Sequence, residues 1–269
     1  MFRSNLLTKA ACGKSCTLPS GHSSGLPQRF LPVVVEKYMH LGQPSALRLL
    51  IALLLVVSLR GEPISAELKE VLKDFRSEGS PGWAFTQKTE GAGKKMLERY
   101  DPRLTEYHRW VLIEKDGRAP TAEETQRYNQ LQTRRSTGQS APNVKDQIDE
   151  STGEILSDDG TRVRWRFKLH ATDKDDSSAP HMAATFTLHR PTRTIERVEL
   201  ASFEPFRPVL GISISQARTV IDYSLPENDR PTLLKQVAMT VRGKAWFFKS
   251  MDEDLVVTYT DYESARQKK

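Results

Sequence analysis

The stretch that decides the fold is TRVRWRFKLH, residues 161–170. Apolar and basic side chains alternate along it: Val163, Trp165, Phe167 and Leu169 against Arg162, Arg164, Arg166 and Lys168. A period of two with one apolar face is typical of a half-buried antiparallel strand. Residues 182–190 follow after a polar loop and place Met182, Ala184, Phe186 and Leu188 on one face, so the two stretches predict a hairpin.

The rest of the chain after residue 152 continues in the same manner. We expect further strands at 194–203, 212–224, 233–242, 245–249 and 255–259, and earlier strands at 83–88, 95–100 and 109–115. No alternation of strands with helices is present, which excludes a doubly wound parallel sheet. The predicted fold class is mainly β (α+β): a curved antiparallel sheet, or an incomplete β-barrel, packed on a short N-terminal helix.

Two helices are expected. In residues 67–76, Leu68, Val71, Leu72 and Phe75 form one apolar stripe. Residues 121–135 begin with a capping box, Thr121 with Glu124, and have a thin apolar face of Tyr128 and Leu131. The polar segment 136–149 is interpreted as a mobile linker, so residues 121–149 form a helix-plus-linker insertion.

An apolar run at residues 49–59, LLIALLLVVSL, lies between Arg48 and Arg60. It is shorter than the roughly 20 residues that cross a bilayer, and it fits the core of a cleavable secretory signal. We expect cleavage after Ala66. Residues 1–38 are then an upstream extension, 39–66 the signal peptide, and 67–269 a single periplasmic domain without a stable membrane span. The alternatives are an uncleaved anchor, a short buried helix, or a transit peptide in the first 35 residues. Whether translation starts at Met1 or Met39 stays open.

Composition excludes several functions. Residues 1–66 hold seven of the 40 Lys and Arg but two of the 34 Asp and Glu, so most of the net charge of +6 lies in the expected leader. The remainder is nearly neutral, and no nucleic-acid partner is expected. Cys12 and Cys16 also lie in the leader. The domain therefore has no thiol for a disulfide, a metal site or a nucleophile.

No catalytic or cofactor motif is found in residues 67–269. The one nucleophile-elbow match, residues 21–25, lies in the leader and lacks the strand and helix that it needs. His170 and His181 end and begin neighbouring strands and could bind a metal, but polar strand ends facing water are the favoured interpretation. We therefore predict no catalytic residues, no metal and no cofactor.

The basic residues of 161–170 have two interpretations. They could form a stripe for an acidic partner or a lipid headgroup. The favoured alternative is a solvated sheet face with ion pairs to acids such as Glu196 and Glu199.

The segment Trp83-Ala84-Phe85-Thr86-Gln87-Lys88 after an amphipathic helix resembles the start of the LolA/LolB-type periplasmic lipoprotein carriers, where Phe-Thr-Gln lies on the first strand. That resemblance implies an incomplete barrel whose apolar hollow receives acyl chains. Tyr100-Asp101-Pro102 and the 121–149 insertion depart from the family pattern. The chain is also similar to exported bacterial proteins with E-R-Y-D-P and D-G-x-x-P-T, here at 98–102 and 116–121, and this similarity implies no function.

The functional hypothesis is an exported protein that binds acyl chains, a lipoprotein or another amphipathic envelope component. Its apolar hollow would be lined by Trp83, Phe85, Trp110, Trp165, Phe167, Phe186, Phe206 and Trp246, with loop 203–210 as a movable rim. The same side chains could equally fill the core. The alternatives are an envelope assembly factor that binds a protein partner and, with no positive motif, a hydrolase.

Overall fold

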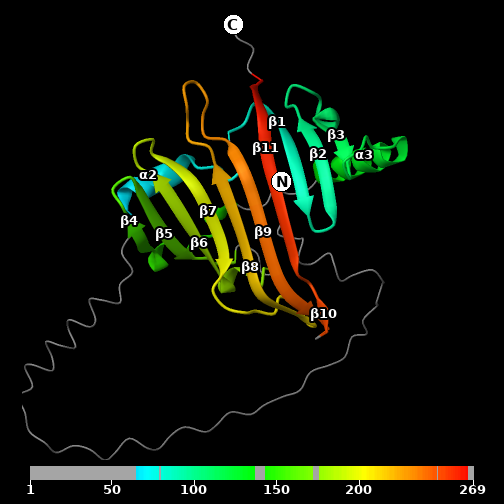
Figure 1. Cartoon of the computed structure of the whole chain (residues 1–269). Coiled ribbons are helices and arrows are strands. Elements are labelled where there is room, and N and C mark those ends of the chain that lie inside the picture. Colours follow the sequence, from blue (N-terminus) through cyan, green and yellow to red (C-terminus); the bar gives the residue numbers. More distant parts are fainter. Residues whose placement is uncertain (1–64, 79, 137–142, 172–175, 247, 266–269) are drawn as a thin grey trace, which may run out of the picture. The chain divides into compact units, whose positions relative to one another are not determined.

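The computed structural model describes residues 65–265 except 79, 137–142, 172–175 and 247, and the statements below concern these residues (Figure 1). The expected signal segment up to residue 64 lies outside them. Ser65 is the N-cap of helix α2 (Ala66–Asp74), and its side chain accepts a hydrogen bond from the Leu68 amide at 3.2 Å. The expected cleavage point after Ala66 therefore falls within the first turn of this helix.

The chain forms one large antiparallel sheet, which confirms the predicted fold class. Strands make up 51% and helices 17%, and the sheet has 11 strands and is not closed into a barrel. Its order is β3-β2-β1-β11-β9-β8-β7-β6-β5-β4, with β10 paired to β9. The strands fan out across a twisted sheet, with α2 near β5–β7 and α3 beside β3 (Figure 1).

The strands are β1 (Trp83–Gly91), β2 (Lys94–Tyr100), β3 (Trp110–Lys115), β4 (Glu154–Asp158), β5 (Arg162–Lys168), β6 (Met182–His189), β7 (Thr194–Ser202), β8 (Ile212–Tyr223), β9 (Leu234–Ala245), β10 (Lys249–Ser250) and β11 (Glu253–Ser264). The second helix is α3 (Ala122–Ser136), and short 3-10 turns are η2 (Glu106–His108), η3 (Val144–Asp146), η4 (Glu150–Thr152) and η5 (Ala179–His181). Neither described helix combines the length and the apolar character that crossing a bilayer requires.

Two strand predictions need correction. The expected separate strand at 245–249 is wrong, because Ala245 ends β9, Lys249 begins β10, and Trp246 between them adopts a positive φ of 50°. The last strand is much longer than the expected 255–259. It pairs with β1 as far as Trp83↔Ser264, and this ladder extends it to Ser264.

The two sheet faces differ in the way that residues 161–170 predict. Val163, Trp165 and Phe167 are buried on the face that carries α2, which we call the helix-bearing face. The opposite face, the charged face, carries Arg162, whose Nε donates to Glu196 Oε1 at 2.6 Å. This ion pair between Arg162 and Glu196 confirms the favoured interpretation, in which the basic residues lie on a solvated face and pair with acids. Glu199 instead accepts from Arg218, at 2.7 Å.

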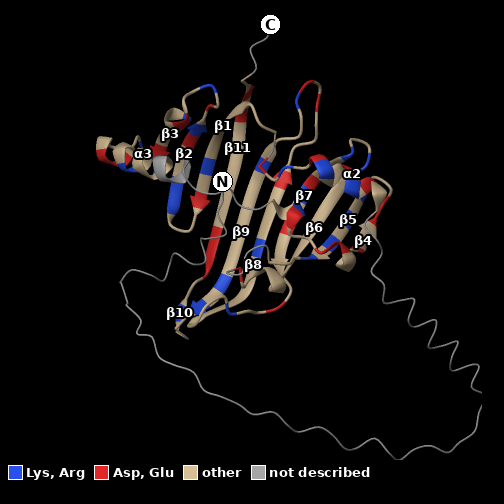
Figure 2. Cartoon of the chain, turned by 180° about the vertical axis from the view of Figure 1, so that it is seen from behind, with Lys and Arg blue, Asp and Glu red and all other residues tan. Residues whose placement is uncertain are grey.

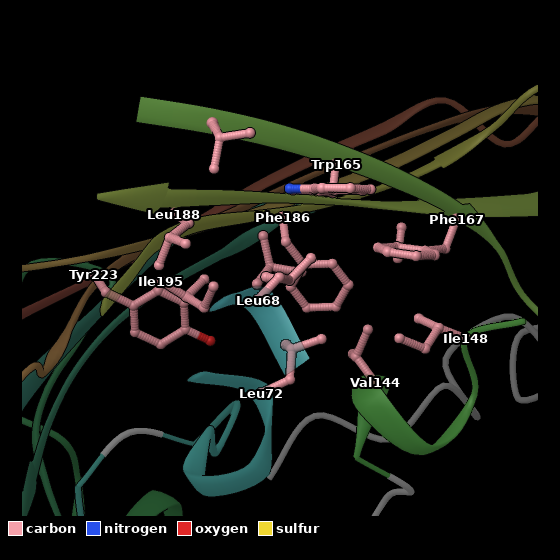
Figure 3. Close-up of a cluster of buried hydrophobic side chains, with 13 residues drawn as sticks. Leu68, Leu72, Val144, Ile148, Trp165, Phe167, Phe186, Leu188, Ile195 and Tyr223 are labelled. Atoms are coloured by element: carbon pink, nitrogen blue, oxygen red, sulfur yellow. The ribbon is translucent and has the colours of Figure 1, made fainter. Parts of the chain in front are cut away.

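The main core lies between α2 and strands β5–β8 (Figure 3). Leu68 and Leu72 of α2 point at Phe186 and its neighbours, as the apolar stripe predicts. Val144 and Ile148 are buried in the same core. The linker prediction is therefore wrong for 143–149, while 137–142 lie outside the described residues.

Helix α3 has the predicted capping box. The Glu124 amide donates to Thr121 Oγ1 at 3.2 Å, and the Thr121 amide donates to Glu124 Oε2 at 2.9 Å. Of the two expected apolar contacts, Tyr128 is buried but Leu131 is 51% exposed. The helix thus docks through Tyr128, whose hydroxyl donates to Glu98 Oε1 on β2 at 2.7 Å.

Candidate functional site

The residues predicted to line one apolar hollow lie in separate parts of the sheet. Trp165, Phe167 and Phe186 belong to the main core, where Leu68 of α2 packs among them (Figure 3). The ring centroids of Phe167 and Phe186 are 6.1 Å apart in an edge-to-face contact. These three side chains are buried in the core, with 3% or less of their surface exposed.

Phe206 and Trp246 lie elsewhere. Phe206 is buried on a bridge to Ile214, and its ring stacks on His181 with centroids 5.3 Å apart. Trp246 is 60% exposed in the turn between β9 and β10. Trp83 is half-buried at the start of β1. The structure therefore divides the predicted set into groups: Trp165, Phe167 and Phe186 meet in the main core, and Phe85 and Trp110 meet elsewhere.

Phe85 is the centre of an aromatic cluster on β1, β2, β3 and β11. Its ring centroid lies 5.7 Å from that of Trp110, 5.0 Å from Tyr100, 5.5 Å from Tyr259 and 5.6 Å from Tyr262. Tyr259 and Tyr262 were missed in the sequence because their proximity depends on the pairing of β1 with β11, near the opposite end of the chain, whereas Tyr100 pairs with Phe85 on the adjacent β2. Their hydroxyls give the cluster polar tips on an apolar base.

The helix-bearing face continues from the main core to this cluster. One row of paired positions crosses the sheet without interruption: Trp165, Phe186, Val198, Ile221, Val237, Val257, Thr89 and Met96. Around Val237 and Val257 a second apolar cluster adds half-buried side chains, including Leu234 and Met239. Its members come from strands and the β1–β2 turn, whereas the main core includes α2 and η3. We call this second cluster the central apolar surface. No helix is among its described members.

A pocket of about 330 Å³ adjoins this surface. It is lined by Ser224, Arg230, Leu234, Lys235, Tyr259, Thr260, Asp261 and Tyr262. The ladder between β9 and β11 ends at Thr258↔Gln236, and beyond it the Tyr262 hydroxyl donates to the Leu234 carbonyl at 2.7 Å. The pocket thus lies where these strands stop pairing, next to the aromatic cluster.

The pocket has a mixed, mainly basic rim. Arg230 and Lys235 make no ion pair among the described residues, and the acid beside them, Asp261, accepts from Thr260 Oγ1 at 2.9 Å. Burial raises the pKa of Tyr259 and Tyr262 well above the usual tyrosine range. Both tyrosines are therefore neutral at physiological pH, and the proton of Tyr262 is donated to the Leu234 carbonyl.

A second pocket, of about 660 Å³, follows Pro120 and the first part of α3. Its lining is small or amide and hydroxyl side chains: Ala122, Thr125, Gln126, Asn129 and Gln130. It offers neither charge nor an aromatic ring, so the pocket beside the aromatic cluster is the better candidate site.

Glu98 is a buried carboxylate near the aromatic cluster, with 4% of its surface exposed. It accepts from Tyr128 Oη at 2.7 Å and from Gln87 Nε2 at 3.0 Å. These contacts attach α3 to the sheet. The described residues contain no group of three or more His, Cys, Asp or Glu that could hold a metal ion.

No family model, curated protein or solved structure matches this chain. The resemblance to LolA/LolB-type carriers stays a prediction.

Proposed function

We propose that the chain is an exported, periplasmic protein that binds an amphipathic ligand with an acyl chain and an anionic head. The observation that carries this proposal is the central apolar surface, which ends at a pocket with two cationic side chains, Arg230 and Lys235. The proposed fold relationship is with the LolA/LolB-type carriers, whose acyl-binding function agrees with such a ligand.

The acyl chain would lie along the central apolar surface. Met239 and Leu234 are half-buried there beside Val237 and Val257. Each methylene that leaves water contributes about 0.8 kcal/mol, so ten of them supply roughly 8 kcal/mol before the costs of association. Met239 suits this role because a flexible thioether adapts to ligands of different shape.

The ligand head would lie in the pocket of about 330 Å³. The Tyr262 hydroxyl already donates its proton to the Leu234 carbonyl at 2.7 Å, so Arg230 and Lys235 are the cationic donors of the pocket. A carboxylate or phosphate needs such donors, and charge-assisted hydrogen bonds are about twice as strong as neutral ones. The site therefore favours an anionic amphipath over a neutral one.

Displacement of a dansyl-labelled fatty acid tests this function. We expect Met239→Glu to weaken binding of the probe at least about tenfold, since a charge on the acyl path is costly to desolvate. Met239→Gln is the uncharged second variant and should weaken binding less. Gln216→Glu, exposed on the charged face, is the matched control and should leave affinity unchanged.

The head pocket is tested by competition. Arg230→Gln with Lys235→Gln should weaken a fatty acid about fivefold or more while leaving the corresponding fatty alcohol unaffected. Equal effects on the acid and the alcohol would exclude the pocket as the head site. If Met239→Glu folds and its affinity for the probe is unchanged, the central apolar surface is excluded as the binding site of the acyl chain.

A protein partner is the second candidate, as for an envelope assembly factor. The observation that favours it is the open sheet, whose edge strands β3 and β4 are both unpaired on one side. Exposed apolar side chains lie on both edges, Val111 on β3 and Ile155 on β4. Such edges can accept an added strand. A polypeptide that co-purifies in place of a lipid would favour this role.

A further inference from the structure

One end of the sheet carries an apolar tip, made of Val209, Leu210, Trp246 and Phe248. Leu210 is 96% exposed, Phe248 85% and Trp246 60%. These side chains come from the loop between β7 and β8 and from the turn between β9 and β10. Large exposed apolar side chains gathered at one place mark an interaction site.

The tip is held in position by contacts between its two segments. The Trp246 amide donates to the Gly211 carbonyl at 2.6 Å. A Cβ added at Gly211 would lie 3.1 Å from Trp246 Cε3, so the indole packs directly on the glycine backbone. The exposed side chains therefore extend from a fixed scaffold formed by the paired ends of β8 and β9.

The backbone at Trp246 costs stability. Its φ of 50° is in the left-handed region, where glycine or asparagine is the favourable residue and a bulky side chain is an outlier. The contact with Gly211 fixes the position of the indole, and the 60% of Trp246 that stays exposed is free for an external contact.

Basic side chains surround the tip. Arg207, Lys244 and Lys249 are exposed and make no ion pair within the part of the chain that the structure describes. Lys and Arg gather at β10 and the adjoining end of β9 (Figure 2). The nearby acids are Asp252, whose carboxylate accepts from the Gly243 amide at 3.2 Å, and Glu253 at the start of β11. The basic side chains around the tip therefore have fewer partners than the nearby acids.

We infer that this tip docks on the surface of an anionic lipid bilayer. A projecting group of Leu, Phe and Trp can enter the acyl boundary, and an indole with its N–H is suited to the headgroup level. Each nearby Lys or Arg adds attraction to anionic lipids, which falls off within a Debye length. The inference is independent of the proposed ligand, whose site lies around the start of β9, whereas the tip lies at its end.

Quenching by brominated phospholipids tests the docking directly, because it reports tryptophans that enter the bilayer. The full chain is mixed with vesicles of phosphatidylcholine alone or with phosphatidylglycerol. The chain has four tryptophans, so the Trp246 contribution is the difference between wild type and Trp246→Phe. This readout is insensitive to vesicle binding through residues 49–59, which does not by itself bring Trp246 into the bilayer.

We expect quenching of Trp246 on anionic vesicles. Phe248→Ser with Leu210→Ser should lower the apparent vesicle affinity of the tip at least about tenfold. Lys249→Gln should lower it about fivefold on anionic vesicles and leave neutral vesicles unaffected. Leu131→Ser on α3, an exposed leucine outside the tip, is the control and should change nothing.

Two outcomes would overturn the inference. The first is no quenching that is specific to Trp246. The second is concentration-dependent self-association in sedimentation that Phe248→Ser abolishes, with no vesicle effect, which would assign the tip to an interface between copies. Loss of fatty-acid binding with intact Trp246 quenching would contradict only the proposed ligand.

Discussion

Phe186→Ala is expected to lower the free energy of unfolding by about 3–5 kcal/mol, the range for a fully buried aromatic truncated to alanine. Phe186 is completely buried, and its ring lies edge-to-face with Phe75 at 6.2 Å and Phe167 at 6.1 Å. It joins the sheet to the segment that carries α2. Urea unfolding followed by circular dichroism gives the difference.

Phe248→Ala is the matched control, since the same side chain is removed from an 85% exposed position. It should change stability by less than about 0.5 kcal/mol. If both variants lose similar, small amounts, then Phe186 does not lie in a packed core and the space under α2 is open to ligands. That result would restore the hollow that the sequence suggests for Trp165, Phe167 and Phe186.

Glu98→Ala is expected to lower the free energy of unfolding by about 2–3 kcal/mol. The change takes an acceptor from the Tyr128 hydroxyl and from the Gln87 amide, both on the buried side of α3 and β1. A buried donor without its partner costs about 1–3 kcal/mol. Hydrogen exchange should show earlier opening of α3 than of β6, because Tyr128 attaches this helix to the sheet.

Glu123→Ala is the control for that experiment. Glu123 pairs with Arg127 on the exposed side of α3, where the two side chains are 77% and 74% exposed. An exposed pair of this kind contributes less than about 0.5 kcal/mol. Equal stability losses from Glu98→Ala and Glu123→Ala would mean that α3 does not depend on the Tyr128 contact.

The parts of the sheet that could be predicted are those that depend on the residue pattern within one strand or between neighbouring strands. The alternation in residues 161–170 gives β5, its buried face and its hairpin with β6, because a period of two is a property of one strand. The pairing of β1 with β11 could not be predicted, since Trp83 and Ser264 meet only in the folded chain. Val144 and Ile148 were missed because isolated apolar residues in a polar segment have no period.

The candidate site was predictable only in part, for the same reason. Phe85 and Trp110 stand out as large aromatics on expected strands, and the structure places their rings 5.7 Å apart. Tyr259 and Tyr262 join them through long-range pairing. Arg230 comes from the connection between β8 and β9 and Lys235 from the start of β9, and no motif indicates that they lie beside β11. The aromatic core residues looked like a hollow because the sequence does not show where α2 packs.

Native mass spectrometry with lipid extraction tests the proposed function most directly. The chain is expressed with its leader in a Gram-negative cell and purified from the periplasm. We predict a protein ion that carries one acyl lipid, lost in Met239→Glu and retained in Gln216→Glu. A bare protein mass with no extractable acyl species, or lipid that persists unchanged in Met239→Glu, would contradict ligand binding at the central apolar surface.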